Sequence, residues 1–212
     1  MSKTTTEENP SYILRWSLTP SPSGSGGDER LVLRYSVQAF EELYVSDRLW
    51  DHRRKVGQVP DPFGVYRFVV GDTLRLVFEQ APHPPNIVPN NVFPPRFSRV
   101  AAGETLERSV DIALPVEEYS ALARDVSEPS EVEQVEQVEL VLGYCLRSEL
   151  DADPVPPPNQ SAEQAGYLLP KAPKRIVSRC KLETPIAVKH RSGYMARYPL
   201  HGEPAPGPAP LP

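Results

Sequence analysis

The chain has 212 residues, of which 26 are proline, 28 are acidic and 23 are lysine or arginine. This length suffices for one large β-domain or two small ones with a full core, so disulfides are not needed for stability. The basic residues are scattered singly or in short groups such as Arg53 to Lys55. Nucleic-acid binding requires clustered cations that neutralise phosphates, so we expect no nucleic-acid partner.

The prolines lie between short runs of alternating apolar and polar residues, and rarely inside them. Their share is well above the usual value of about 5%. Proline has no backbone N–H for a β-ladder and is therefore confined to turns, strand ends and sheet edges. The pattern predicts an all-β chain.

In chain order, the first ten residues are polar and are expected to be flexible. Alternation then predicts strands over 12–18, 31–38, 43–50, 65–70, 73–79, 97–114, 138–147, 175–182, 186–190 and 194–200. The stretch 97–114 is expected to contain a turn at Gly103 and Glu104. Gly71 and Asp72 separate two of these runs, which predicts a tight hairpin with positive φ at Gly71. Arg108 interrupts an apolar row, which favours a strand with one exposed end. The run from Val138 to Arg147 is the strongest and is expected to be central.

One short helix is predicted over Pro115 to Arg124, because proline and acidic residues suit a first helical turn. The acidic stretch from Glu128 to Glu139 carries valines three residues apart. That spacing favours a helical turn or irregular coil over a strand.

These elements predict an antiparallel two-sheet sandwich, immunoglobulin-like, with one short helix and long proline-rich loops. A closed barrel is the alternative. We expect a flexible N-terminus over 1–10, a single sandwich domain over 11–200 and a disordered proline-rich tail over 201–212.

The two cysteines are expected on opposite faces of their sheet. Alternation places Cys180 with Ile176 and Leu182 toward the core, and directs Cys145 outward. We expect them to be unbonded, as in a reducing compartment. The chain starts without an apolar leader and contains no run long enough to span a membrane, so we predict a cytoplasmic protein without a membrane partner.

Signals for chemistry are weak. No serine elbow or phosphate-binding glycine loop occurs, and the histidines lack metal-ligand spacing, so we predict no catalytic residue, no metal and no cofactor. The histidines are His52, His83, His190 and His201. Asp47, Asp51 and Asp61 could hold calcium at one end of a sandwich, but solvated acids are the preferred interpretation.

The candidate interaction site is the loop over 81–95, APHPPNIVPNNVFPP. Proline lowers the entropy cost of ordering a loop on binding, and asparagine supplies hydrogen bonds. The candidate contact residues are Pro84, Pro85, Asn86, Asn90, Asn91 and Phe93. The alternative is that the apolar residues of this loop fold back and cap the sandwich.

Three segments, Tyr44 to Asp47, Gly64 to Phe68 and Gly103 to Leu106, are similar to bacterial intracellular proteinase inhibitors, which are sandwiches. The resemblance covers less than half of the chain. It implies an inhibitor whose loop over 81–95 enters a protease cleft and resists cleavage.

We therefore predict a non-enzymatic sandwich that binds an unidentified protein partner through its proline-rich loops or an exposed sheet edge. The alternatives are the inhibitor and a hydrolase. The hydrolase site would be built from Asp47, Asp51 and His52, or around His83. No oligomeric state is predicted.

Overall fold

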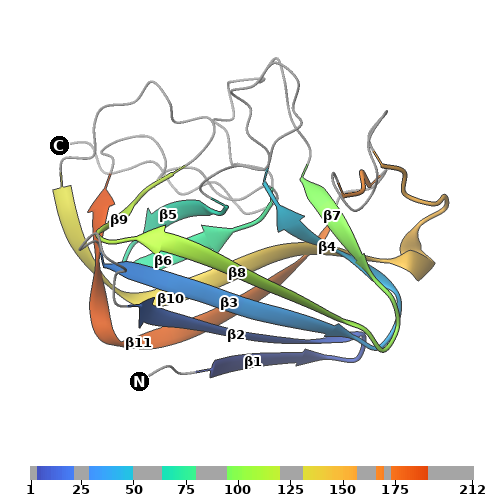
Figure 1. Cartoon of the computed structure of the whole chain (residues 1–212), viewed down its shortest axis with the longest axis horizontal. Coiled ribbons are helices and arrows are strands. Elements are labelled where there is room, and N and C mark those ends of the chain that lie inside the picture. Colours follow the sequence, from blue (N-terminus) through green and yellow to red (C-terminus); the bar gives the residue numbers. More distant parts are fainter. Residues whose placement is uncertain are drawn as a thin grey trace, which may run out of the picture.

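The computed structural model describes residues 4–21, 29–49, 64–79, 95–119, 131–156, 166–169 and 173–190. Within these ranges the chain is all-β, and its strands form two sheets (Figure 1). The single helical element described there is a 3-10 turn, Arg147–Glu149. The all-β, two-sheet prediction is confirmed.

The four-stranded sheet, which we call sheet A, is antiparallel with the order β1-β2-β3-β8. Its strands are β1 (Thr4–Asn9), β2 (Tyr12–Ser21), β3 (Arg30–Ala39) and β8 (Thr105–Ala113). The sequence predicts a flexible start, but Thr4–Asn9 pairs along its whole length with β2. A short polar segment suits a sheet border, where one side of the strand remains in water.

The second sheet, sheet B, has the order β5-β6-β10-β11-β9, and β4 pairs with both β10 and β7. Its strands are β4 (Leu43–Arg48), β5 (Tyr66–Val70), β6 (Thr73–Val77), β7 (Arg96–Val100), β9 (Val116–Glu117), β10 (Glu131–Leu146) and β11 (Lys174–His190). The predicted hairpin is present between β5 and β6, with φ of 62° at Gly71. β10 runs parallel to β6, and β11 runs parallel to β9. The antiparallel prediction is therefore wrong for sheet B, which is mixed.

The acidic stretch is a strand from Glu131 onward, contrary to the prediction of coil or helix. The register between β10 and β11 shifts between Val135 and Gln137. This bulge places Val135 and Val138 on the same core face although they are three residues apart. Proline is tolerated at such irregularities, and Pro185 lies at this one, where it divides β11 into the two runs predicted from the sequence.

The helix predicted over 115–124 is not formed in its described part. Val116–Glu117 pairs with β11 instead, and Tyr119 forms a bridge with Arg67 of β5. The N–H of Tyr119 donates to the carbonyl of Arg67 at 2.9 Å, and the reverse bond is 3.0 Å. Pairing with strands distant in sequence has overridden the local preference for helix.

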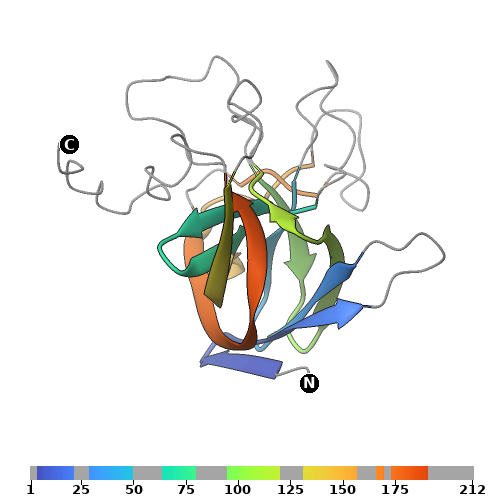
Figure 2. The same ribbon diagram turned by 90° about the vertical axis from the view of Figure 1, so that its left-hand side faces the viewer.

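The chain passes between the sheets twice at one corner. Residues 40–42 connect β3 to β4, and residues 101–104 connect β7 to β8. Because β3 pairs with β8 and β4 pairs with β7, one long antiparallel ladder bends from sheet A into sheet B (Figure 1). This corner places β8 at the border of sheet A, opposite the border formed by β1. Figure 2 shows β1 crossing beneath the lower end of β11.

The main core lies between the two sheets and includes Leu14, Leu33, Leu140 and Ile176. Across this core, Trp16 Nε1 donates a hydrogen bond to Ser178 Oγ at 2.9 Å. Sheet B also carries two apolar clusters outside the main core, one around Phe68 and Val141 and one around Tyr44 and Phe97. Sheet A, by contrast, presents a polar outer face.

The two cysteines are not joined by a disulfide, as predicted. Cys180 packs against the main core, also as predicted. Cys145 belongs to the cluster that contains Tyr44 and Phe97, so it lies outside the main core but is buried. The prediction that Cys145 lies on the sheet face away from the main core is therefore confirmed. The implied exposure to solvent is wrong, because the side chain is buried.

Candidate functional site

Most residues singled out from the sequence lie outside the described part of the chain. These are the loop residues Pro84, Pro85, Asn86, Asn90, Asn91 and Phe93, together with Asp51, His52, Asp61 and His83. Asp47 is the member of the hydrolase and calcium alternatives that the structure describes. No group of three metal-ligating side chains occurs among the described residues. In the same ranges no helix is long and apolar enough to cross a membrane.

Asp47 lies on β4 and is buried between the sheets. Ser98 Oγ donates to Asp47 Oδ2 at 2.9 Å, and Arg108 Nε donates to the same oxygen at 2.7 Å. Arg108 belongs to β8, so this ion pair joins sheet A to sheet B. The prediction of a strand with one exposed end agrees with β8, in which Leu106, Arg108 and Val110 are only partly buried and Ile112 is buried. The guanidinium of Arg108 nevertheless turns to Asp47.

The surroundings of Asp47 are only partly polar. Asp47 Oδ1 and the hydroxyl of Tyr35 are buried and have no hydrogen-bond partner among the described residues. Burial raises the pKa of the Asp47 carboxyl, and the charge of Arg108 opposes this effect. Burial also raises the pKa of Tyr35 well above its usual value. A carboxylate held in this way serves as a contact between sheets and is not presented to a substrate.

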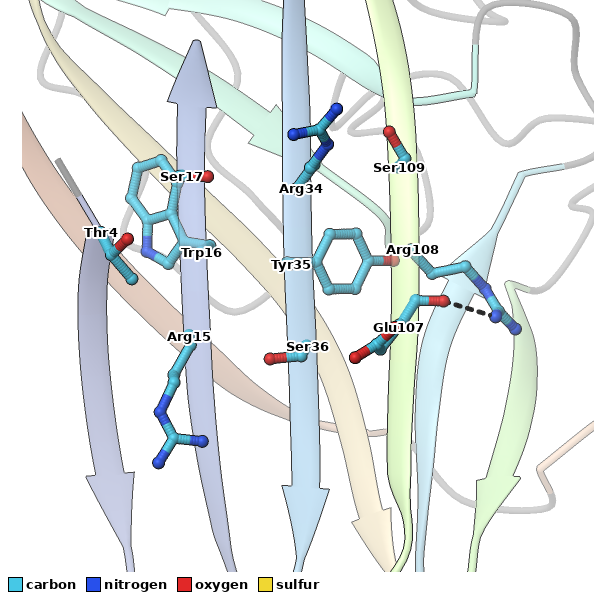
Figure 3. A pocket seen from close by; sticks show the side chains of 10 residues that line it. All are labelled: Thr4, Arg15, Trp16, Ser17, Arg34, Tyr35, Ser36, Glu107, Arg108 and Ser109. Carbon is cyan, nitrogen blue, oxygen red and sulfur yellow. Dashed lines mark hydrogen bonds between the residues drawn. The ribbon is translucent and has the colours of Figure 1, made fainter. Parts of the chain in front are cut away.

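The outer face of sheet A has a hollow of about 520 Å³ at its centre (Figure 3). Short side chains from three neighbouring strands, Ser17, Ser36 and Ser109, lie among the longer Arg15 and Arg34. In Figure 3 the two arginines extend in opposite directions along their strands. Neither guanidinium has an ion-pair partner within the described ranges. The hollow therefore offers hydroxyl and guanidinium groups to hydrogen-bond acceptors of a bound molecule.

β8 forms one border of sheet A, and no described segment pairs with its outer edge. The N–H of Leu114 donates to the carbonyl of Glu29 at 2.9 Å, and the N–H of Ala39 donates to the carbonyl of Glu104 at 2.9 Å. Even-numbered residues therefore bond toward β3. Antiparallel ladders alternate, so the odd-numbered residues direct their N–H and C=O groups outward. These residues are Thr105, Glu107, Ser109, Asp111 and Ala113.

The core is also incompletely covered beside β8. On β2 the inward side chains of Leu14 and Trp16 are 0% and 2% exposed, because β1 lies outside that strand. On β8 the inward side chains of Leu106 and Val110 pack against the same core but are only partly buried. Arg108 Nη1 donates to the outward carbonyl of Glu107 at 2.9 Å (Figure 3). Within the described ranges no strand pairs with the outer edge of β8, and its inward side chains Leu106 and Val110 are partly accessible. We call this region the β8 border.

No family model matches the chain, and neither a curated protein nor a solved structure matches it. The geometry of the two sheets is therefore the basis for the functional argument.

The sequence reveals part of the β8 border. Alternation from Thr105 to Ile112 predicts the strand correctly and separates an apolar row from a row that contains Glu107 and Asp111. Alternation does not show which strands lie on either side, because strand order depends on pairing between distant segments. The absence of proline from this run is the signal that was available for a regular strand with intact backbone donors.

Proposed function

We propose that the chain is a non-enzymatic β-sandwich module that binds another protein. The observation that supports this function is the β8 border, where outward N–H and C=O groups accompany partly exposed Leu106 and Val110. An open strand of this kind can accept an extended segment of a partner as an additional strand. Backbone hydrogen bonds then provide affinity, and the side chains provide specificity.

β8 lacks most of the features that prevent an edge strand from pairing with a strand of another protein. Natural sheet borders are commonly blocked by short strands, prolines, bulges or inward charges. β8 has nine residues, pairs with β3 without a register shift and contains no proline. Its inward charge, Arg108, is bound to Asp47 and also donates from Nη1 to the outward carbonyl of Glu107 at 2.9 Å, so an added strand has to replace this one bond. The opposite border, β1, is shorter, and the residues that pair with Trp16 and Leu14 are the polar Thr5 and the exposed Glu7.

Several finer features belong to the same proposal. We retain the proline-rich loop over 81–95 as a second contact region, on its sequence alone. An immunoglobulin-like arrangement is supported by the face-to-face packing of the sheets and by the two connections, at 40–42 and 101–104, that pass from one sheet to the other. A cytoplasmic location is supported by the lack of a disulfide between Cys145 and Cys180. The hydrolase alternative loses support because Asp47 is occupied by Arg108 and Ser98.

Affinity purification of the full chain from its native host, followed by mass spectrometry, tests the proposed function. We expect a stoichiometric protein partner with the wild-type chain and with Ser109→Ala. We expect it to be lost with Ser109→Pro, because proline removes an outward N–H of β8 while leaving the bonds to β3 in place. Thermal unfolding checks that this variant folds, and Thr105→Pro, at the first residue of the strand, is the replacement if it does not.

Two results would contradict the proposal. One is capture of the same partner in equal amount by wild type and by the folded proline variant. The other is the absence of any partner together with turnover in a substrate screen.

A further inference from the structure

The outward side chains of β8 are acidic. Glu107 and Asp111 lie on the outer face, separated by Ser109. Glu107 has no ion-pair partner in the described part of the chain. Asp111 lies 3.9 Å from Arg30 Nη1, and both of these side chains are more than half exposed. An exposed pair of this length contributes little, so both carboxylates remain available to a neighbouring strand.

The inward side chains of β8 have a different character. Leu106, Val110 and Ile112 belong to the core side, and Arg108 between them is bound to Asp47. Gly64 already lies against part of the Val110 side chain. An apolar side chain opposite Leu106, or over the rest of Val110, would cover the accessible part of the core and remove apolar surface from water. The two faces of β8 therefore require different residues from a strand placed beside it.

We propose that the segment that binds the β8 border is an extended, amphipathic strand with apolar residues toward the core and basic residues on the outer face. This inference rests on the proposed function and specifies the chemistry of the partner. Residues directly opposite in an antiparallel pair have Cβ atoms about 5 Å apart, so opposite charges attract and like charges repel. A lysine or arginine opposite each of Glu107 and Asp111 would form an attractive charge pair at both positions. The two basic residues are then four residues apart in the partner strand.

A second copy of β8 fits this requirement poorly. Antiparallel pairing centred on Ser109 would place Glu107 opposite Asp111 of the copy, which sets like charges against each other. A basic strand from a different protein avoids this conflict, and we take it as the occupant of the β8 border.

Two synthetic peptides test the inference on the full chain. The first, TVKVTVKVT, places lysines opposite Glu107 and Asp111 and valines toward the core. The second, TVEVTVEVT, differs only in charge, and both sequences are palindromic, so the direction of binding does not alter the match. Binding is followed by NMR titration of the β8 amides. We expect the lysine peptide to bind about tenfold more tightly than the glutamate peptide, since two attractive pairs replace two repulsive ones.

Charge reversal provides the matched control. In Glu107→Lys/Asp111→Lys the preference is expected to switch to the glutamate peptide. In Glu7→Lys/Glu8→Lys, which makes the same change in net charge on β1, the preference for the lysine peptide is expected to remain. Ser109→Pro is expected to weaken binding of both peptides.

Equal binding of the two peptides to wild type overturns the inference about charge. Failure of the lysine peptide to perturb the β8 amides, or a preference unchanged by the double reversal on β8, also overturns it. A concentration-dependent dimer that pairs through β8, detected by sedimentation, contradicts the choice of partner. Capture of the native partner, measured separately and sensitive to Ser109→Pro, decides the proposed function whatever the peptides show.

Discussion

Asp47 shows most clearly how burial and charge act at the scale of single residues. Its carboxylate is paired with Arg108 across the two sheets, yet burial raises its pKa. An acid whose pKa is raised by folding contributes most to stability below its unfolded value, near 4. That contribution falls as the pH rises through the folded pKa. The charge of Arg108 limits the loss at neutral pH.

Arg108→Met therefore should destabilise the chain by about 3 kcal/mol at pH 7, because it leaves Asp47 ionised in a buried site without its partner. The cost should shrink as the pH falls and Asp47 takes up a proton. Urea unfolding of wild type and variant across this pH range measures the difference. Adding Asp47→Asn to the variant is the control, and it should remove most of the pH dependence. A cost that does not change with pH would contradict this account of the pair.

At the scale of the elements, local patterns were sufficient wherever a strand alternates regularly. The strands predicted over 12–18 and 31–38 and the hairpin at Gly71 are present, and the strand predicted from Leu43 is present as far as Arg48. The errors fall where a distant segment changes the local pattern. The bulge near Val135 alters the periodicity of β10, and pairing with β11 and Arg67 replaces the helix expected after Pro115.

The bulge in β10 makes a direct prediction about two valines of the acidic stretch. Val135 is 0% exposed and Val132 is 60% exposed. Val135→Ala is expected to lower the free energy of unfolding by about 2 kcal/mol, because it removes buried apolar surface and leaves a cavity. Val132→Ala is expected to change stability by less than about 0.5 kcal/mol. Chemical denaturation of both variants compares these values, and similar costs for the two would contradict the assigned register.

At the scale of the whole molecule, the two sheets differ in what they leave accessible. Sheet B carries apolar clusters outside the main core, whereas sheet A has a polar outer face and ends in the β8 border. The composition predicts the all-β class and the two layers. It cannot place β8 at a border, because that position follows from the ladder that bends between the sheets at 40–42 and 101–104.

The proposed binding of a partner requires that the outer edge of β8 is unpaired in the protein alone, and hydrogen exchange resolved at single amides by NMR tests this most directly. In the full chain without a partner, the even-numbered amides from Leu106 to Ile112 should be protected by their bonds to β3. The odd-numbered amides from Thr105 to Ala113 should exchange much faster, which gives an alternating pattern along the strand. Uniform protection of both sets would contradict the account, because it would mean that the outer edge of β8 is already paired.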